Sequence, residues 1–175
     1  MDTEPPIPPI FLIMEIGDRQ RHWPGIDQSK LEALTRRTLT REGVEAAEIS
    51  IILVDDATIR DINRRHLAHD WPTDVITFPL SQPGETPLSG ELILSTETAL
   101  TSARIAGADP WNELSLYLVH GLLHLIGFDD QTLEDAETMR HREAFHLAAE
   151  GLANPFDRVE PMAVASDREA QPCPV

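Results

Sequence analysis

The chain has 175 residues, 41% of them apolar, which suits one compact domain with a hydrophobic core. Its formal net charge of −16 is opposite in sign to the basic surface that nucleic-acid binding normally shows. The apolar run at residues 10–14 is far too short to span a membrane, and the single cysteine, Cys173, has no internal disulfide partner. We therefore expect a cytoplasmic protein with neither a signal peptide nor a membrane anchor.

Apolar periodicity and turn residues divide the chain into strands and helices. In chain order, the predicted elements are a strand at 10–16, a helix at 29–43, a strand at 48–54, a helix at 56–65, strands at 73–80 and 91–95, and helices at 96–107, 110–126 and 132–151. The proline-broken residues 1–9 and the aperiodic residues 152–175 are expected to be a disordered leader and tail. This leaves a single domain over residues 10–151.

Several helix boundaries carry specific signals. Ser29 with Glu32, and Thr132 with Asp135, have capping-box spacing. Before residue 110, Asp109 is placed to cap a helix whose first position is a proline. The starts of the predicted helices at 29–43, 110–126 and 132–151 depend on these signals.

The helix at 110–126 has apolar residues around most of its circumference, which predicts a central position in the domain. One stripe interrupts this pattern: Glu113, Tyr117, His120 and His124 follow steps of four, three and four, so they lie on one face. Histidines four apart on a helix direct two imidazole nitrogens toward one point, as a transition metal requires. Gly121, which is costly within a helix, indicates that another backbone or a substrate approaches closely.

A catalytic metal usually has three protein ligands and one open position. After the helix turns at residue 127, either Asp129 or Asp130 is available as the third ligand. His141 and His146 on the last predicted helix are competing candidates, although histidines on an exposed helix are more often surface residues. The zincin motif is excluded, because its glutamate base is replaced here by a glycine.

The segment HGLLHLIGFD, residues 120–129, resembles the signature H-G-x-L-H-L-x-G-[FYW]-D-H of the YbeY family of bacterial endoribonucleases and ribosomal RNA maturation factors. Residues 63–79 are similar to L-N-x-x-Y-R-x-x-D-x-P-T-D-V-L-S-F, and residues 90–93 to G-D-I-V-I. The likeness covers roughly residues 10–150. It implies an α+β domain in which a four-stranded mixed sheet packs against helices and a metal-binding helix is central and buried.

The resemblance also implies one zinc ion bound by His120, His124 and Asp130, where Asp130 replaces the third histidine of the family signature. Glu91 stands at the family's aspartate near the metal, so it is expected to orient or deprotonate the attacking water. A solvent-exposed carboxylate at the strand end is an equally weighted alternative for Glu91. We assign catalysis to Glu91 and His120.

Within residues 63–79, the sequence departs from the family pattern at two positions. The family's arginine falls on Leu67 and its tyrosine on His66, with Arg64, Arg65 and His69 as possible substitutes. Thr73 and Asp74 are expected to stabilise the turn into the next strand. For Trp71 and Trp111, packing is preferred over base stacking.

The function that follows from this resemblance is metal-dependent cleavage of single-stranded RNA in 16S ribosomal RNA maturation and ribosome quality control. The expected RNA contacts are Arg60, Arg64 and Arg65, and proteins of the small ribosomal subunit are possible partners. The alternative is a non-catalytic, zinc-containing ribosome-assembly factor. The net acidity and the residues at positions 67 and 130 favour that alternative more than in a standard family member.

Overall fold

A computed structural model describes residues 9–153 of the chain. The expected leader and tail lie outside the described residues, except at positions 9, 152 and 153. The elements are β1 (Phe11–Asp18), α1 (Gln28–Arg41), β2 (Ala46–Val54), α2 (Asp56–Leu67), β3 (Val75–Pro79), β4 (Leu88–Ser95), α3 (Thr96–Ala106), α4 (Pro110–Ile126) and α5 (Leu133–Ala149). Every element predicted from the sequence is present, and α4 has the predicted bounds.

The four strands form one mixed sheet in the order β1-β2-β4-β3. β1, β2 and β4 are parallel, whereas β3 pairs antiparallel with β4. The parallel pairs are connected through helices, as parallel pairing requires. The predicted α+β class with a four-stranded mixed sheet is therefore confirmed.

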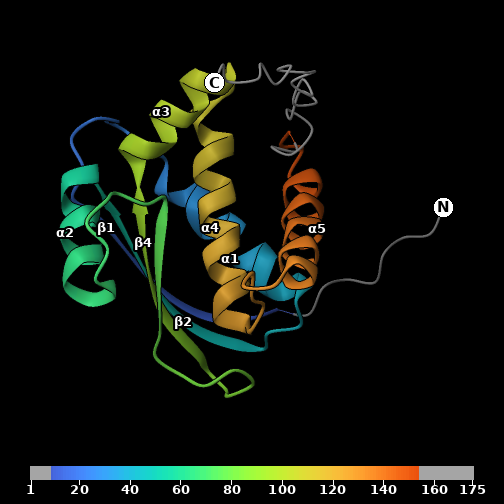
Figure 1. Cartoon of the computed structure of the whole chain (residues 1–175). Coiled ribbons are helices and arrows are strands. Elements are labelled where there is room, and N and C mark those ends of the chain that lie inside the picture. The colour runs from blue at the N-terminus through green and yellow to red at the C-terminus, as the bar shows by residue number, and fades with distance from the viewer. Residues whose placement is uncertain (1–8, 154–175) are drawn as a thin grey trace, which may run out of the picture.

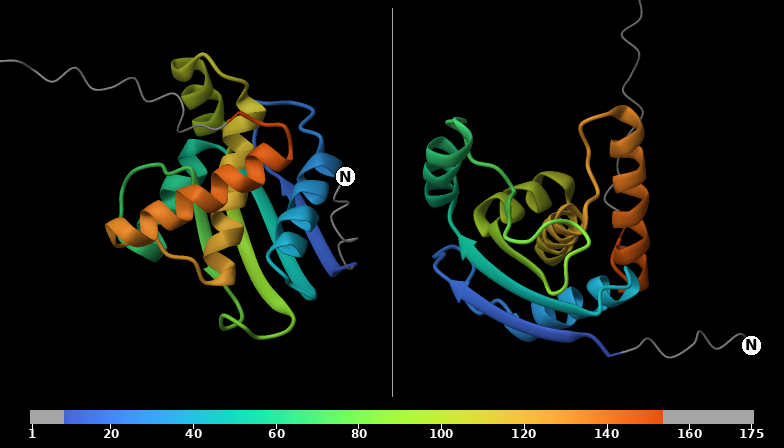
Figure 2. Two further views of the ribbon diagram at one scale, coloured as in Figure 1. Left: turned by 90° about the vertical axis from the view of Figure 1, so that its right-hand side faces the viewer. Right: turned by 90° about the horizontal axis from the view of Figure 1, so that it is seen from below.

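The helices cover the sheet unequally (Figures 1 and 2). α4 packs against β3 and β4 and also contacts α1, α3 and α5, so it is the central helix of the domain. α2 covers the opposite face, where Ile59 forms a smaller apolar cluster with Val54, Ile76 and Ile93. Within residues 9–153, no helix is long and apolar enough to cross a membrane.

Two glycines allow α4 to lie close to the sheet. A Cβ at position 121 would lie 2.7 Å from Leu92 Cδ2 and 3.1 Å from Thr77 Oγ1. On β4, a Cβ at position 90 would collide with the side chain of Leu125. The close approach predicted at Gly121 is thus made by side chains of the sheet, not by a second backbone or a substrate.

One predicted helix boundary is wrong. The capping box assigned to Ser29 does not form, because Asp27 is the N-cap of α1 and its carboxylate accepts a hydrogen bond from the Ser29 backbone N–H at 3.0 Å. At α5, Thr132 is the N-cap as predicted, and its hydroxyl oxygen accepts from the Asp135 backbone N–H at 3.1 Å. Aspartate, serine and threonine are all favoured N-cap residues. The spacing of Ser29 and Glu32 alone therefore could not show that Asp27 caps α1.

α5 packs into the main core through Met139 and Leu147, and ion pairs also join it to α1. Glu150 contacts Arg37 and Arg41 on α1. In the other direction, Glu42 at the end of α1 contacts Arg142 and His146 on α5. These contacts are important for the site, because α5 supplies one wall of the pocket described below.

Candidate metal centre and adjacent pocket

The two histidines of α4 lie side by side near its C-terminal end. His120 Nε2 and His124 Nε2 are 3.0 Å apart, and each side chain is about a quarter exposed, at 25% and 26%. α4 ends at Gly127, which has φ 117°, a value that L side chains rarely adopt. This turn reverses the chain toward the histidines.

Asp130 completes the cluster. Its Oδ2 lies 3.8 Å from His120 Nε2 and 3.9 Å from His124 Nε2. The neighbouring Asp129 instead accepts a hydrogen bond from the Asp130 backbone N–H at 2.8 Å. The structure therefore brings together the three side chains predicted as ligands.

The competing histidines lie elsewhere. His141 is exposed on α5, whereas His146 is fully buried with its Nε2 2.6 Å from a carboxylate oxygen of Glu42. Burial lowers the pKa of His146, and the neighbouring Arg142 also lowers it, while Glu42 raises it. Neither side chain belongs to the cluster of His120, His124 and Asp130.

The outer nitrogens of both rings are already engaged. His120 Nδ1 lies 2.6 Å from Glu143 Oε1, and His124 Nδ1 donates to the Phe128 carbonyl oxygen at 3.0 Å. A carbonyl oxygen can only accept, so neutral His124 carries its proton on Nδ1 and has a lone pair on Nε2. The same holds for neutral His120 beside an ionised Glu143.

When both rings are neutral, two imidazole lone pairs and one carboxylate face a common point, an arrangement that fits a cation. The Zn–N and Zn–O distances typical of tetrahedral zinc imply a separation between ligand atoms of about 3.3 Å. The observed separations of 3.0, 3.8 and 3.9 Å bracket that value. The chemistry and spacing of the donor atoms thus suit zinc.

The charge state of His120 reflects its neighbours. Burial lowers the pKa of His120, but the hydrogen bond and charge of Glu143, together with Asp74 and Asp130, raise it by more, so the net pKa is above its usual value. The carboxylates thus favour positive charge at this position. A proton and a metal ion compete for it.

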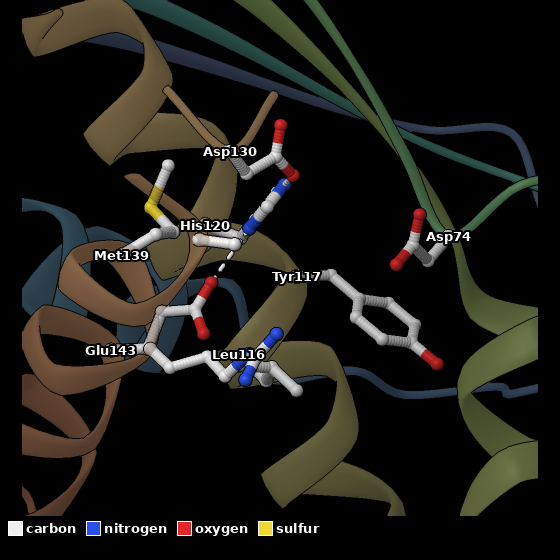
Figure 3. A pocket seen from close by; sticks show the side chains of 9 residues that line it. Asp74, Leu116, Tyr117, His120, Asp130, Met139 and Glu143 are labelled. Atoms are coloured by element: carbon white, nitrogen blue, oxygen red, sulfur yellow. Dashed lines mark hydrogen bonds and ion pairs between the residues drawn. The ribbon is translucent and has the colours of Figure 1, made fainter. Parts of the chain in front are cut away.

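A pocket of about 370 Å³ opens beside His120. Its lining residues come from α4, α5, the segment before β3 and the turn after α4; they are Asp74, Leu116, Tyr117, His120, Asp130, Ala136, Met139, Arg140 and Glu143. Figure 3 shows Asp74 and Glu143 on opposite sides of this space, with Tyr117 and His120 between them. Burial raises the pKa of Tyr117 to about 12, so the phenol stays neutral.

The expected catalytic role of Glu91 is inconsistent with its position. On β4 the neighbouring Leu92 faces α4, as its contact with position 121 shows. Successive side chains on a strand point to opposite faces, so Glu91 points to the face that α2 covers, together with Ile93. Glu91 does not line the pocket.

Asp74 is a carboxylate that does line the pocket. As predicted, it stabilises the turn into β3, because its Oδ1 accepts hydrogen bonds from Thr73 Oγ1 at 2.9 Å and from the Val75 backbone N–H at 2.8 Å. The same contacts hold its carboxylate at the pocket wall (Figure 3). Asp74 therefore has a place in the site that the sequence did not assign to it.

The arginines predicted to bind RNA lie on α2, and none of them lines the pocket. Arg60 pairs with Asp70 at 2.9 Å, while Arg64 and Arg65 both pair with Asp61 at 2.7 Å. Their role in RNA binding stays a prediction.

Leu67, the last residue of α2, and Trp71, which follows the helix, are both exposed. Leu67 is 48% exposed, and Trp71 is 57% exposed and stacked on His69. The packing role expected of Trp71 is therefore limited to this stacked pair, whereas Trp111 packs against the main core.

Most of the described chain is similar to known proteins. A family model described as Endoribonuclease YbeY matches residues 15–151. The chain belongs to the YbeY family. Endoribonuclease YbeY of Anaeromyxobacter dehalogenans is 43% identical over 124 residues, which cover 70% of this chain and 64% of that relative. Endoribonuclease YbeY of Methylocella silvestris is 33% identical over 161 residues, covering 89% and 90%.

The match to the Anaeromyxobacter YbeY protein spans less than two thirds of that relative's length. Among solved structures, TM1509 from Thermotoga maritima has a TM-score of 0.54 and 24% identity, covering 87% of this chain and 99% of TM1509. At that identity the likeness concerns the fold alone, and it supports the architecture described above for this YbeY chain.

Glu143 is the site residue that sequence reasoning missed. It is 4% exposed and contacts His120, although the two residues are 23 positions apart. The helical spacing of Glu143 relative to Met139, His146 and Leu147 was the available signal, because these four residues form the buried stripe of α5. A carboxylate on an apolar helix face requires a partner, and here that partner is a ring nitrogen of the neighbouring helix.

Proposed function

We propose that this chain is a zinc-dependent endoribonuclease that cleaves single-stranded RNA in the cytoplasm. Within that activity we propose a role in 16S ribosomal RNA maturation and ribosome quality control. The observation that carries the proposal is the convergence of His120, His124 and Asp130 at the edge of an open pocket, in a member of the YbeY family. The relatives named Endoribonuclease YbeY support the reaction class.

His120, His124 and Asp130 would hold the ion, and Glu143 and the Phe128 carbonyl orient the two rings. When bound, zinc supplies Lewis acidity toward a phosphodiester and toward water. In place of Glu91, we assign to Asp74 the task of orienting water and accepting its proton. Asp74 is suited to this because it lines the pocket and is held by Thr73 and Val75.

The ligand assignment is tested by exchanging Asp130. Asp130→Ala should lose zinc, whereas Asp130→His should retain or tighten it, because imidazole is also a zinc ligand. His141→Ala serves as a control, since that side chain is exposed and outside the cluster. Zinc content is measured after purification without added metal, and melting temperature with and without zinc gives a second readout. Equal zinc content in Asp130→Ala and the unmodified protein would contradict the assignment.

The alternative function is a zinc-containing ribosome-assembly factor that binds ribosomal RNA or small-subunit proteins without cleaving RNA. It is favoured by the exposed Leu67 at the position of the family's arginine and by the net charge of −16. Incubation with single-stranded RNA, with and without a chelator, separates the two functions. Chelator-sensitive cleavage supports the nuclease, and binding without cleavage supports the assembly factor.

A further inference from the structure

α5 presents one stripe of side chains to the pocket. Ala136, Met139, Arg140 and Glu143 are spaced three, one and three apart, so they share a helix face. Met139 and Glu143 are buried, whereas Arg140 is exposed. Arg140 therefore stands on the solvent side of the stripe, at the mouth of the pocket.

The charges around the pocket are mostly negative. Asp74, Asp130 and Glu143 contribute three carboxylates, and the protein as a whole is strongly acidic. A phosphodiester is repelled by such a wall unless cations offset it. Among the described residues, Arg140 is the one arginine or lysine that lines this pocket.

The guanidinium of Arg140 is also uncommitted. Within residues 9–153, Arg140 has no hydrogen bond, ion pair or ring contact. The arginines of α2 differ, because each contacts an aspartate: Arg60 with Asp70, and Arg64 and Arg65 with Asp61. A free guanidinium keeps five N–H donors in the planar arrangement that matches two phosphate oxygens.

We propose that Arg140 binds a backbone phosphate of the single-stranded RNA and positions it in the pocket beside His120. The inference rests on the proposed nuclease function and adds a substrate-binding residue to it. The residue lies on α5, far in sequence from the arginine position of the family pattern, which Leu67 occupies here.

The test compares Arg140→Gln and Arg140→Lys with Arg104→Gln. The control makes the same charge change at an exposed position on α3 that does not line the pocket. Binding of a fluorescent single-stranded RNA is measured on zinc-free protein in chelator over a range of salt concentrations. Cleavage by the zinc-loaded proteins gives KM and kcat, and zinc content confirms that the metal centre is intact.

Arg140→Gln should weaken RNA binding about 5- to 10-fold at low salt and reduce the slope of log K against log salt by about 0.7, the value for one phosphate contact on a single strand. Arg140→Lys should restore the salt slope, because the charge is retained. It should not restore kcat fully, because an ammonium lacks the two-point geometry of a guanidinium. Arg104→Gln should match the unmodified protein in every measurement.

Equal affinity and salt slope for Arg140→Gln and Arg104→Gln would overturn the proposal. Failure of the nuclease function is a separate result, namely that the zinc-loaded unmodified protein binds RNA without cleaving it. In that case, a reduced salt slope in Arg140→Gln still assigns the phosphate contact to Arg140.

Discussion

Replacing Glu143 by glutamine tests whether this buried carboxylate supports the metal centre. The side chain is 4% exposed and lies 2.6 Å from His120 Nδ1, so solvent has little access to replace the interaction. Glutamine has nearly the same shape and keeps an acceptor oxygen, but it removes the negative charge. The change therefore isolates the electrostatic contribution of Glu143 to the basicity of His120.

The expected loss of zinc affinity is 10- to 100-fold, the usual effect of removing a partner of a metal-bound histidine. This corresponds to about 1.4–2.7 kcal/mol. A charge-assisted hydrogen bond of this length is worth about 1.5–3 kcal/mol, which agrees with that range. The middle of this range, about 30-fold, is the expected loss for Glu143→Gln.

The pH dependence gives an independent check. Burial lowers the pKa of His120, and Glu143 is the first of the groups that raise it above its usual value. As the pH falls, a proton therefore begins to compete with zinc for His120 at a higher pH in the unmodified protein than in Glu143→Gln. The difference in zinc affinity between the two proteins should be largest above the raised pKa and should shrink as the pH falls through it.

Zinc affinity is measured by competition with a chelator of known affinity from pH 5.5 to pH 8. Glu137→Gln is the matched control, since it makes the same change at an exposed position of α5. Affinities for Glu143→Gln and Glu137→Gln within threefold of each other at pH 8 would refute the reasoning.

Gly121→Ala should lower the free energy of unfolding in urea by up to about 2 kcal/mol, because contact with the sheet costs about 1–3 kcal/mol and helix propensity returns about 1; a more stable variant would mean that the sheet yields. Burial raises the pKa of Glu150, but two α1 arginines lower it below its usual value, so its stabilisation is present at neutral pH and lost as the pH falls through the lowered pKa. Glu150→Gln should therefore destabilise by about 1–2 kcal/mol at pH 7 and not in acid, and a pH-independent deficit would contradict this. Replacing Arg60, Arg64 and Arg65 together by glutamine is expected to weaken RNA binding and its salt dependence; unchanged binding would exclude α2 from the RNA surface.

The sequence by itself determined α4 and the two histidines on it. Asp109 and Pro110 set the start of the helix, and Gly127 sets its end. These signals depend on neighbouring residues only, so tertiary structure is not needed to interpret them. The spacing of His120 and His124 then fixes two nitrogens on one face, whatever packs around the helix.

The face on which Glu91 lies could not be inferred from the sequence. β4 is buried on both faces, with Leu92 and Leu94 toward α4 and Ile93 toward α2. A strand covered on both sides lacks the alternation of apolar and polar residues that identifies its inner face. Only the packing of α4 and α2 decided that Glu91 points away from the histidines.

The partner of His120 likewise depended on tertiary structure. α5 buries Met139 and Leu147 in the main core together with α4, and Glu42 and Glu150 add ion pairs that join α1 to α5. That arrangement brings Glu143 to His120 and places Arg140 at the mouth of the pocket. Local sequence determines where a helix begins and ends and which residues share a face, but contacts between distant segments determine what that face meets.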